Sequence, residues 1–132
     1  MRSALGADEI FSGVVAAIYI PSVDRDGAAV DQEAWKDEAM TLFARLFGGA
    51  SAIQLDGVWL DQERDSLVSD EPFLVYSHTL AGAVDPAKLA DIGAFARRLL
   101  VGTKQGEVGI VIGPGYYAIR PPKEDTDGRD DS

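Results

Sequence analysis

The chain has 132 residues, of which 46% are hydrophobic, and this size and composition are typical of one domain with one core. Its formal net charge of -10, from 12 basic and 22 acidic residues, argues against binding to nucleic-acid phosphates or to anionic lipid headgroups. The absence of cysteine excludes disulfides, thiolate metal sites and cysteine nucleophiles.

The first half of the chain predicts a lead-in, a strand and a helix. Residues 1–12 carry no clear pattern, whereas the apolar run "VVAAIYI", 14–20, ends at Pro21 and predicts a buried strand. Asp31 is expected to cap a helix that ends at Gly48–Gly49. An apolar stripe at helical spacing runs along this helix, formed by Trp35, Ala39, Leu42, Phe43, Leu46 and Phe47.

Two further strands are expected in the middle of the chain. The segment 50–60 alternates roughly between apolar and polar residues, and Asp56–Gly57 indicates a bulge or a tight bend in it. The acidic segment 61–71 is expected to be a solvated loop. The run "PFLVYSHTL", 72–80, is rich in strand formers and predicts the next strand.

The last third begins with a second helix and ends in a tail. Asp85 followed by Pro86 is a strong helix start signal. The run "EVGIVIG", 107–113, predicts a strand, and "YYAIR", 116–120, is expected to pair back as a short hairpin arm after a Gly-Pro-Gly turn. Residues 121–132 contain no hydrophobic residue, so we expect a disordered acidic tail.

The order strand, helix, strand, strand, helix, strand predicts a single ferredoxin-like βαββαβ domain over residues 13–120. We expect a four-stranded antiparallel sheet with both helices on one face. The right-handed crossover rule places the first and last long strands in the middle and the other two at the edges.

The segment from Val14 to Ile119 resembles small uncharacterised bacterial proteins of the ferredoxin-like type. The resemblance rests on "GGASAIQLDGVWLDQ" after the first helix and "GEVGIVIGPGYYAI" after the second. It supports the fold and implies no activity.

The acidic segment is the first candidate site. The spacing of Asp61, Glu63 and Asp65 is similar to the start of a calcium loop, but the loop glycine and the terminal glutamate are not at the required offsets. We therefore predict no metal site. The glycines of 109–115 fit no phosphate-binding pattern, and we predict no cofactor.

His78 is the second candidate, because a histidine oriented by a carboxylate can act as a general base. Strand alternation puts Tyr76 and His78 on one face of their strand, and which face is buried stays open. A small-molecule enzyme of the dimeric α/β-barrel kind would use these two residues together with Asp61 and Glu71.

Trp59, Tyr116 and Tyr117 form a third group, which lies at predicted strand ends and is either a set of interface anchors or a cover for the core. With both helices on one side, the other face of the sheet would expose apolar side chains, so we expect it to bind a second copy or a protein partner. The main hypothesis is a non-catalytic interaction or regulatory module in a bacterial assembly, and the alternative is the small-molecule binder or enzyme. No apolar run is long enough to span a membrane and no secretion signal is evident, so we expect a cytoplasmic protein.

Overall fold

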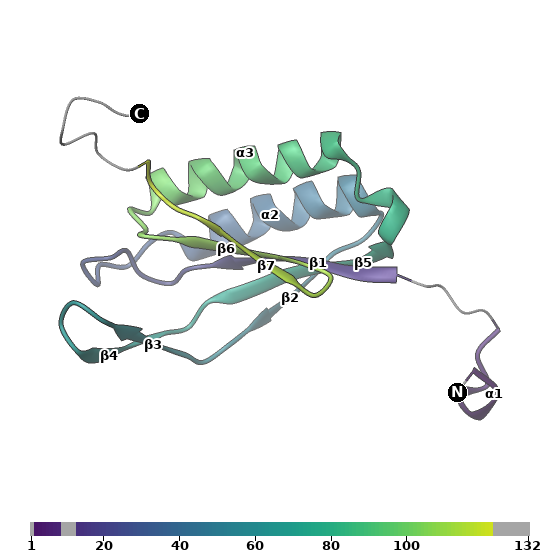
Figure 1. Cartoon of the computed structure of the whole chain (residues 1–132), viewed down its shortest axis with the longest axis horizontal. Coiled ribbons are helices and arrows are strands. Elements are labelled where there is room, and N and C mark those ends of the chain that lie inside the picture. Colours follow the sequence, from purple (N-terminus) through teal and green to yellow (C-terminus); the bar gives the residue numbers. More distant parts are fainter. Residues whose placement is uncertain (1, 9–12, 123–132) are drawn as a thin grey trace.

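The computed structural model describes residues 2–8 and 13–122, and its centre is an antiparallel sheet. Within these residues the sheet has five strands in the order β2-β5-β1-β6-β7 (Figure 1). Their bounds are Gly13–Ile20 for β1, Ser51–Gln54 for β2, Phe73–Leu80 for β5, Val108–Ile112 for β6 and Gly115–Ile119 for β7.

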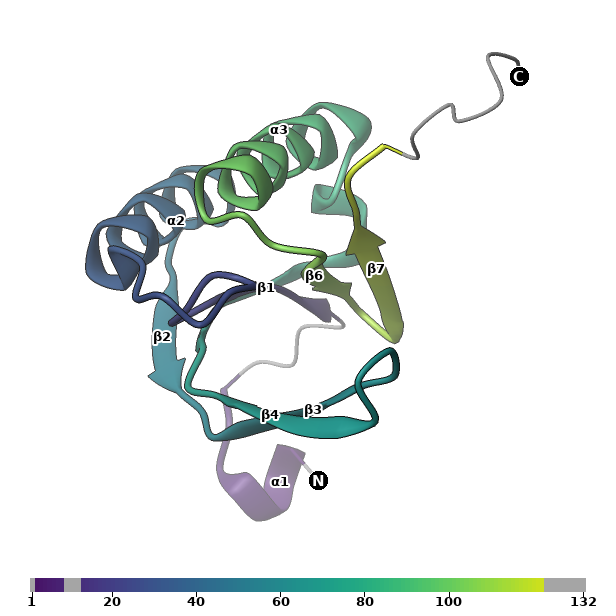
Figure 2. The same cartoon turned by 90° about the vertical axis from the view of Figure 1, so that its left-hand side faces the viewer.

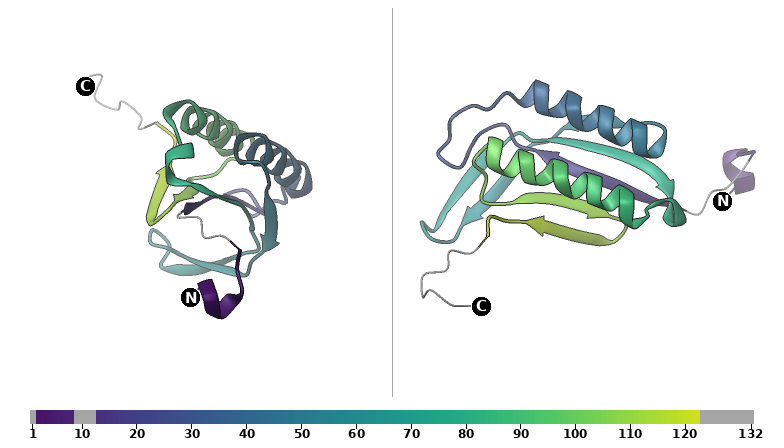
Figure 3. Two further views of the ribbon diagram at one scale, coloured as in Figure 1. Left: turned by 90° about the vertical axis from the view of Figure 1, so that its right-hand side faces the viewer. Right: turned by 90° about the horizontal axis from the view of Figure 1, so that it is seen from above.

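Two long helices pack side by side on one face of this sheet (Figures 1 and 3). They are α2 (Gln32–Phe47) and α3 (Pro86–Gly102), while α1 (Arg2–Leu5) and the 3-10 turn η1 (Ala81–Ala83) are short. Both long helices begin at the predicted caps, because the carboxylate of Asp31 accepts a hydrogen bond from the backbone N–H of Ala34 and that of Asp85 from Lys88.

The core lies between these helices and the sheet. Ile18 of β1, Val75 of β5 and Phe43 of α2 have no exposed surface. Ile18 is paired with Val75 on one side and with Ile110 of β6 on the other, and cross-strand partners share a face of the sheet. The opposite face of β1 therefore carries Tyr19. Other residues on this side of the sheet are Val15, Ala17, Tyr76, His78, Gly109 and Tyr116.

A β-hairpin lies on that opposite face, away from the helices (Figure 2). It consists of β3 (Gly57–Asp61) and β4 (Ser66–Asp70), which pair with each other as a separate two-stranded sheet. The carboxylate of Asp61 accepts hydrogen bonds from the backbone N–H groups of Glu63 and Arg64, and Asp65 has a positive φ of 48°. These features close the turn between the strands.

The predicted four-stranded ferredoxin-like sandwich is wrong. The segment 116–120 supplies β7, a complete edge strand, and the acidic segment 61–71 supplies β4 instead of a solvated loop. The predicted strand 50–60 divides at Asp56 into β2 and β3, which belong to different sheets. The segment 72–80, expected at an edge, is β5 in the interior of the sheet.

The physical reason for the error is cross-strand pairing. Ser66–Asp70 has the composition of a loop, but its central residues Leu67 and Val68 lie opposite Leu60 and Trp59. Such pairs stabilise a strand that its own composition does not indicate.

Several expectations from the sequence concern segments that the structure describes only in part. Residues 9–12 of the expected lead-in and 123–132 of the expected acidic tail lie outside the described residues. Among the described residues, no helix is both long enough and apolar enough to cross a membrane.

Candidate functional site

A cavity of about 470 Å³ opens between the β3–β4 hairpin and the sheet face that the helices leave uncovered, and we call it the hairpin cavity. Its walls come from distant parts of the chain, because β1, the hairpin, β6 and β7 all contribute. The residues that line it are Tyr19, Pro21, Trp59, Leu60, Asp70, Pro72, Gln105, Glu107, Val108, Gly109 and Tyr116.

Tyr116 forms the sheet side of the hairpin cavity, and its position depends on Gly109. A Cβ atom placed on Gly109 would lie 2.5 Å from the Tyr116 Oη and 2.8 Å from its Cε2. The phenol end of Tyr116 therefore occupies the space that any side chain at position 109 would fill. Glycine at this strand position permits the ring to lie against the neighbouring strand.

The hydroxyl of Tyr116 is held by Glu107. It donates a hydrogen bond of 2.6 Å to the Glu107 Oε2, and the Arg120 Nε donates one of 2.9 Å to the Oε1. The hydrogen bond from Tyr116 and the charge of Arg120 lower the pKa of Glu107, so Glu107 is ionised at neutral pH. Burial raises the pKa of Tyr116, and so do the hydrogen bond to Glu107 and the negative charge of Glu107, so the hydroxyl stays protonated and remains a donor.

Asp70 joins the end of the hairpin to the loop after β1. Its Oδ1 accepts hydrogen bonds from the hydroxyl and the backbone N–H of Ser22, and from the backbone N–H of Glu71 at 2.8 Å. Nearby, the Gln32 side chain donates to the backbone carbonyls of Ile20 and Glu71. This network fixes one end of the hairpin cavity, and Asp70 adds a second carboxylate to the cavity wall.

Gln105 adds an amide to the same wall. Its Nε2 donates to the backbone carbonyls of Val23 at 2.7 Å and Thr103 at 3.1 Å. Because both partners are acceptors, the amide must present its nitrogen to them, and its oxygen is then left to accept a hydrogen bond. The hairpin cavity thus combines aromatic surface, carboxylates and an amide oxygen.

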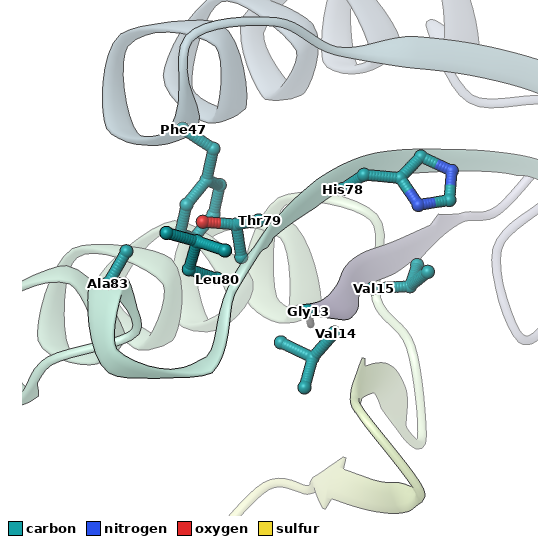
Figure 4. Close-up of a pocket in the computed structure, with 8 residues that line it drawn as sticks. All are labelled: Gly13, Val14, Val15, Phe47, His78, Thr79, Leu80 and Ala83. Atoms are coloured by element: carbon teal, nitrogen blue, oxygen red, sulfur yellow. The ribbon is translucent and has the colours of Figure 1, made fainter. Parts of the chain in front are cut away.

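A second cavity of about 540 Å³ lies at the other end of β1, and His78 is one of its lining residues. Figure 4 shows the His78 ring directed away from Phe47 and Leu80, which line the same cavity. The ring of His78 contacts Tyr76 edge to face, with centroids 5.9 Å apart. Among the described residues, no hydrogen bond joins His78 to a carboxylate that would orient it as a base.

The candidate residues from the sequence fall into different places. Trp59 and Tyr116 line the hairpin cavity, whereas His78 lines the second cavity. Tyr117 alternates with Tyr116 and pairs with Ile110, which places it on the helix side of the sheet. Their functional roles stay predictions.

The two carboxylates proposed to work with His78 line neither of these cavities, although Glu71 stands between Asp70 and Pro72 of the hairpin cavity. Asp61 closes the turn of the hairpin, and Glu71 accepts hydrogen bonds through its backbone carbonyl. Among the described residues, no group of three or more histidine or acidic side chains is placed to hold a metal ion.

Two polar residues of the hairpin cavity, Gln105 and Glu107, were missed by the sequence reasoning, and Asp70 was considered only as part of the acidic segment 61–71. Each lies at the end of an apolar strand or just before one, where a polar residue looks like part of a turn. The spacing of Glu107, Gly109, Tyr116 and Arg120 around a Gly-Pro-Gly turn is the signal that could have revealed the group, because a hairpin brings these positions together.

No family model matches the chain. Two curated proteins align with part of it, the UDP-N-acetylmuramate--L-alanine ligases of Paracidovorax citrulli (strain AAC00-1) and Variovorax paradoxus (strain S110). Each is 30% identical over 81 residues, which is 61% of this chain and 17% of the ligase. The chain therefore corresponds to about a sixth of the length of these relatives.

Two solved structures resemble the fold over most of its length. A phage SAM lyase in complex with S-methyl-5'-thioadenosine has a TM-score of 0.64 and 18% sequence identity, over 86% of this chain and 95% of the lyase. A phage SAM lyase in the apo state has a TM-score of 0.62 and 16% identity, over 89% and 98%. The likeness concerns the fold, and it agrees with the correction of the four-stranded prediction.

Proposed function

We propose that the chain is a small-molecule enzyme that binds an adenosine-type sulfonium or thioether, of which SAM and S-methyl-5'-thioadenosine are the model ligands, in the hairpin cavity. The observation that carries the proposal is the composition of this cavity, in which aromatic and carboxylate side chains line about 470 Å³ in a fold similar to that of a SAM lyase. This volume is in the range of small-molecule sites.

The wall chemistry supports a cationic ligand. Tyr19, Trp59 and Tyr116 bring three aromatic rings to the hairpin cavity, and ring faces attract cations such as a sulfonium. Asp70 and Glu107 bring negative charge to the cavity wall. The charge of Glu107 is balanced by its ion pair with Arg120. The acidic character of the whole chain, at -10, adds long-range attraction for a cation.

The reaction considered is cleavage of a carbon–sulfur bond. The step balances when the carboxylate oxygen of SAM's own amino-acid chain attacks the carbon bonded to sulfur: a carbon–oxygen bond forms as the carbon–sulfur bond breaks. The sulfur keeps the electron pair of the broken bond, and the products are a lactone of the amino-acid chain and the neutral thioether S-methyl-5'-thioadenosine. A positive charge at sulfur disappears during this step, so the apolar aromatic surface of the cavity wall favours the neutral product.

The test is to incubate the purified chain with SAM and to measure S-methyl-5'-thioadenosine by liquid chromatography and mass spectrometry. We expect product to form faster than in a control without protein, and we expect Asp70→Asn to reduce the rate. Absence of product above the control without protein would contradict the proposal.

The alternative of a non-catalytic module predicts a different result. It predicts that SAM and S-methyl-5'-thioadenosine leave the melting temperature unchanged, whereas a bound ligand at a hundred times its Kd stabilises the folded state by about 2.7 kcal/mol. Melting temperatures measured with and without each compound therefore distinguish a protein that binds these ligands from a module that does not.

A further inference from the structure

Two aromatic rings that line the hairpin cavity each lie over a glycine. The phenol end of Tyr116 lies over Gly109, as described above, and the six-membered ring of Trp59 lies over Gly57 of the same hairpin strand. A Cβ atom placed on Gly57 would be 3.3 Å from the Trp59 Cζ2. In each case the missing side chain makes room for the ring beside the backbone.

The two rings belong to the two opposed sides of the hairpin cavity. Trp59 comes from β3 and Tyr116 from β7, and the hairpin lies across the face of the sheet that carries Tyr116 (Figure 2). Both side chains retain about half of their surface, with 50% of Trp59 and 55% of Tyr116 exposed. Aromatic area on both sides of a cavity therefore remains available to a ligand.

The Tyr116 ring is also fixed before any ligand binds. Its hydroxyl is anchored on Glu107, which is itself paired with Arg120. A ring held in this way loses little conformational freedom when a second ring stacks on it, and such preorganisation favours binding. Ionised Glu107 fits this anchoring role, because both of its oxygens accept hydrogen bonds from protein side chains.

We propose that Tyr116 and Trp59 form the two sides of a slot for a flat heteroaromatic ring, with Gly109 as the seat that lets Tyr116 lie against the sheet. The ligand class is a purine nucleoside, and the base is the part that enters the slot. The inference rests on the proposed function for the choice of ligands, and it adds which part of the ligand these residues recognise. Tyr116 and Trp59 are binding residues in this account, and Glu107 is a positioning residue.

The experiment measures Kd by titration calorimetry for S-methyl-5'-thioadenosine, for adenosine, and for S-methyl-5-thioribose, which keeps the sugar and the thioether but has no base. Removing one stacked aromatic side chain weakens binding of a base by roughly 5- to 150-fold. We expect Tyr116→Leu to show a loss in this range for the two ligands with a base and no loss for the thioribose. The matched control is Tyr117→Leu, which removes an equally exposed tyrosine from the helix side of β7 and should bind as the wild type does.

Gly109→Ala tests independently whether the Tyr116 ring must lie against the backbone of Gly109. The new methyl group would displace the Tyr116 ring, so we expect a loss comparable to that of Tyr116→Leu. In the double variant Gly109→Ala with Tyr116→Leu, the ring is already absent, and the alanine should add no further loss. Circular dichroism and the melting temperature of each variant confirm that it is folded at the temperature of the titration.

The outcomes separate this inference from the proposed function. If adenosine binds and depends on Tyr116 while SAM is not cleaved, the slot is supported and the enzymatic proposal fails. If S-methyl-5'-thioadenosine binds equally to Tyr116→Leu and Tyr117→Leu, the slot is wrong and the proposed function survives. If the wild type binds no ligand that contains a base, both are overturned.

Discussion

The ion pair between Glu107, on the wall of the hairpin cavity, and Arg120 permits a test of which ligand charge the protein prefers. Glu107 and Arg120 are joined by a hydrogen bond of 2.9 Å, so together they contribute no net charge. Glu107→Gln leaves the positive charge of Arg120 unbalanced beside the wall, whereas Arg120→Gln leaves the negative charge of Glu107 unbalanced on it. The two variants therefore change the wall by one charge in opposite directions.

The size of the effect follows from Coulomb's law. Two unit charges about 6 Å apart, at an effective dielectric constant of about 40, interact by about 1.4 kcal/mol, which is about tenfold in Kd. We expect Glu107→Gln to weaken the binding of cationic SAM by about tenfold relative to neutral S-methyl-5'-thioadenosine. Arg120→Gln should change the same ratio by about tenfold in the opposite direction.

The ratio of the two ligands is the quantity to measure, by titration calorimetry at low and high salt. Glu107→Gln also removes a charged anchor of the Tyr116 ring, but that loss affects both ligands and cancels in the ratio. At 1 M salt, where the Debye length is about 3 Å, the difference between the variants should shrink. A ratio that stays the same in both variants at low salt would refute the electrostatic reasoning.

Three further predictions test the fold, the tyrosine anchor and assembly. Gly102→Ala should lower the free energy of unfolding by about 1–3 kcal/mol, because its Cβ would lie 2.7 Å from the ring of Trp35. Gly93→Ala, which has open space around its Cβ, should raise the melting temperature. The stability that Tyr116 adds over Tyr116→Phe should be constant near neutral pH. This added stability should fall above about pH 10, because folding raises the pKa of the phenol. It should also fall below about pH 4.5, because folding lowers the pKa of the partner carboxylate, Glu107. Melting temperatures from pH 3 to 11 measure both limits. We propose that the chain self-associates on the hairpin side of the sheet, where Leu67 is 72% exposed. Light scattering should show that Leu67→Glu abolishes association and that Val101→Glu on α3 does not. A wild type that is monomeric at high concentration would overturn this proposal.

The sequence was informative wherever a local signal decides the structure. The helix starts at Asp31 and Asp85 could be predicted because capping depends only on a side chain and the next few backbone N–H groups. The buried run 14–20 was predicted as a strand for a similar reason, since it is apolar on both faces. In the structure, Ile18 faces the helices, and Ala17, on the opposite side, is also almost fully buried.

The rest depends on contacts between distant residues. Nothing local to Ser66–Asp70 indicates that it pairs with β3 and lies across the sheet. The hairpin cavity depends on this placement, because it brings Trp59 to the same cavity as Tyr116 from the last strand. His78 attracted interest as the single histidine, yet no described carboxylate orients it, and composition could not reveal that.

The most direct test of the account is a titration of isotope-labelled protein with S-methyl-5'-thioadenosine, followed by nuclear magnetic resonance. A ligand bound in the hairpin cavity should give saturable shifts that concentrate at the Trp59 indole N–H and at the backbone N–H groups of Gly109 and Tyr116. Signals of Gly13 and His78 in the second cavity should change little. Shifts that concentrate at Gly13 and His78, or no saturable shifts at all, would contradict the account.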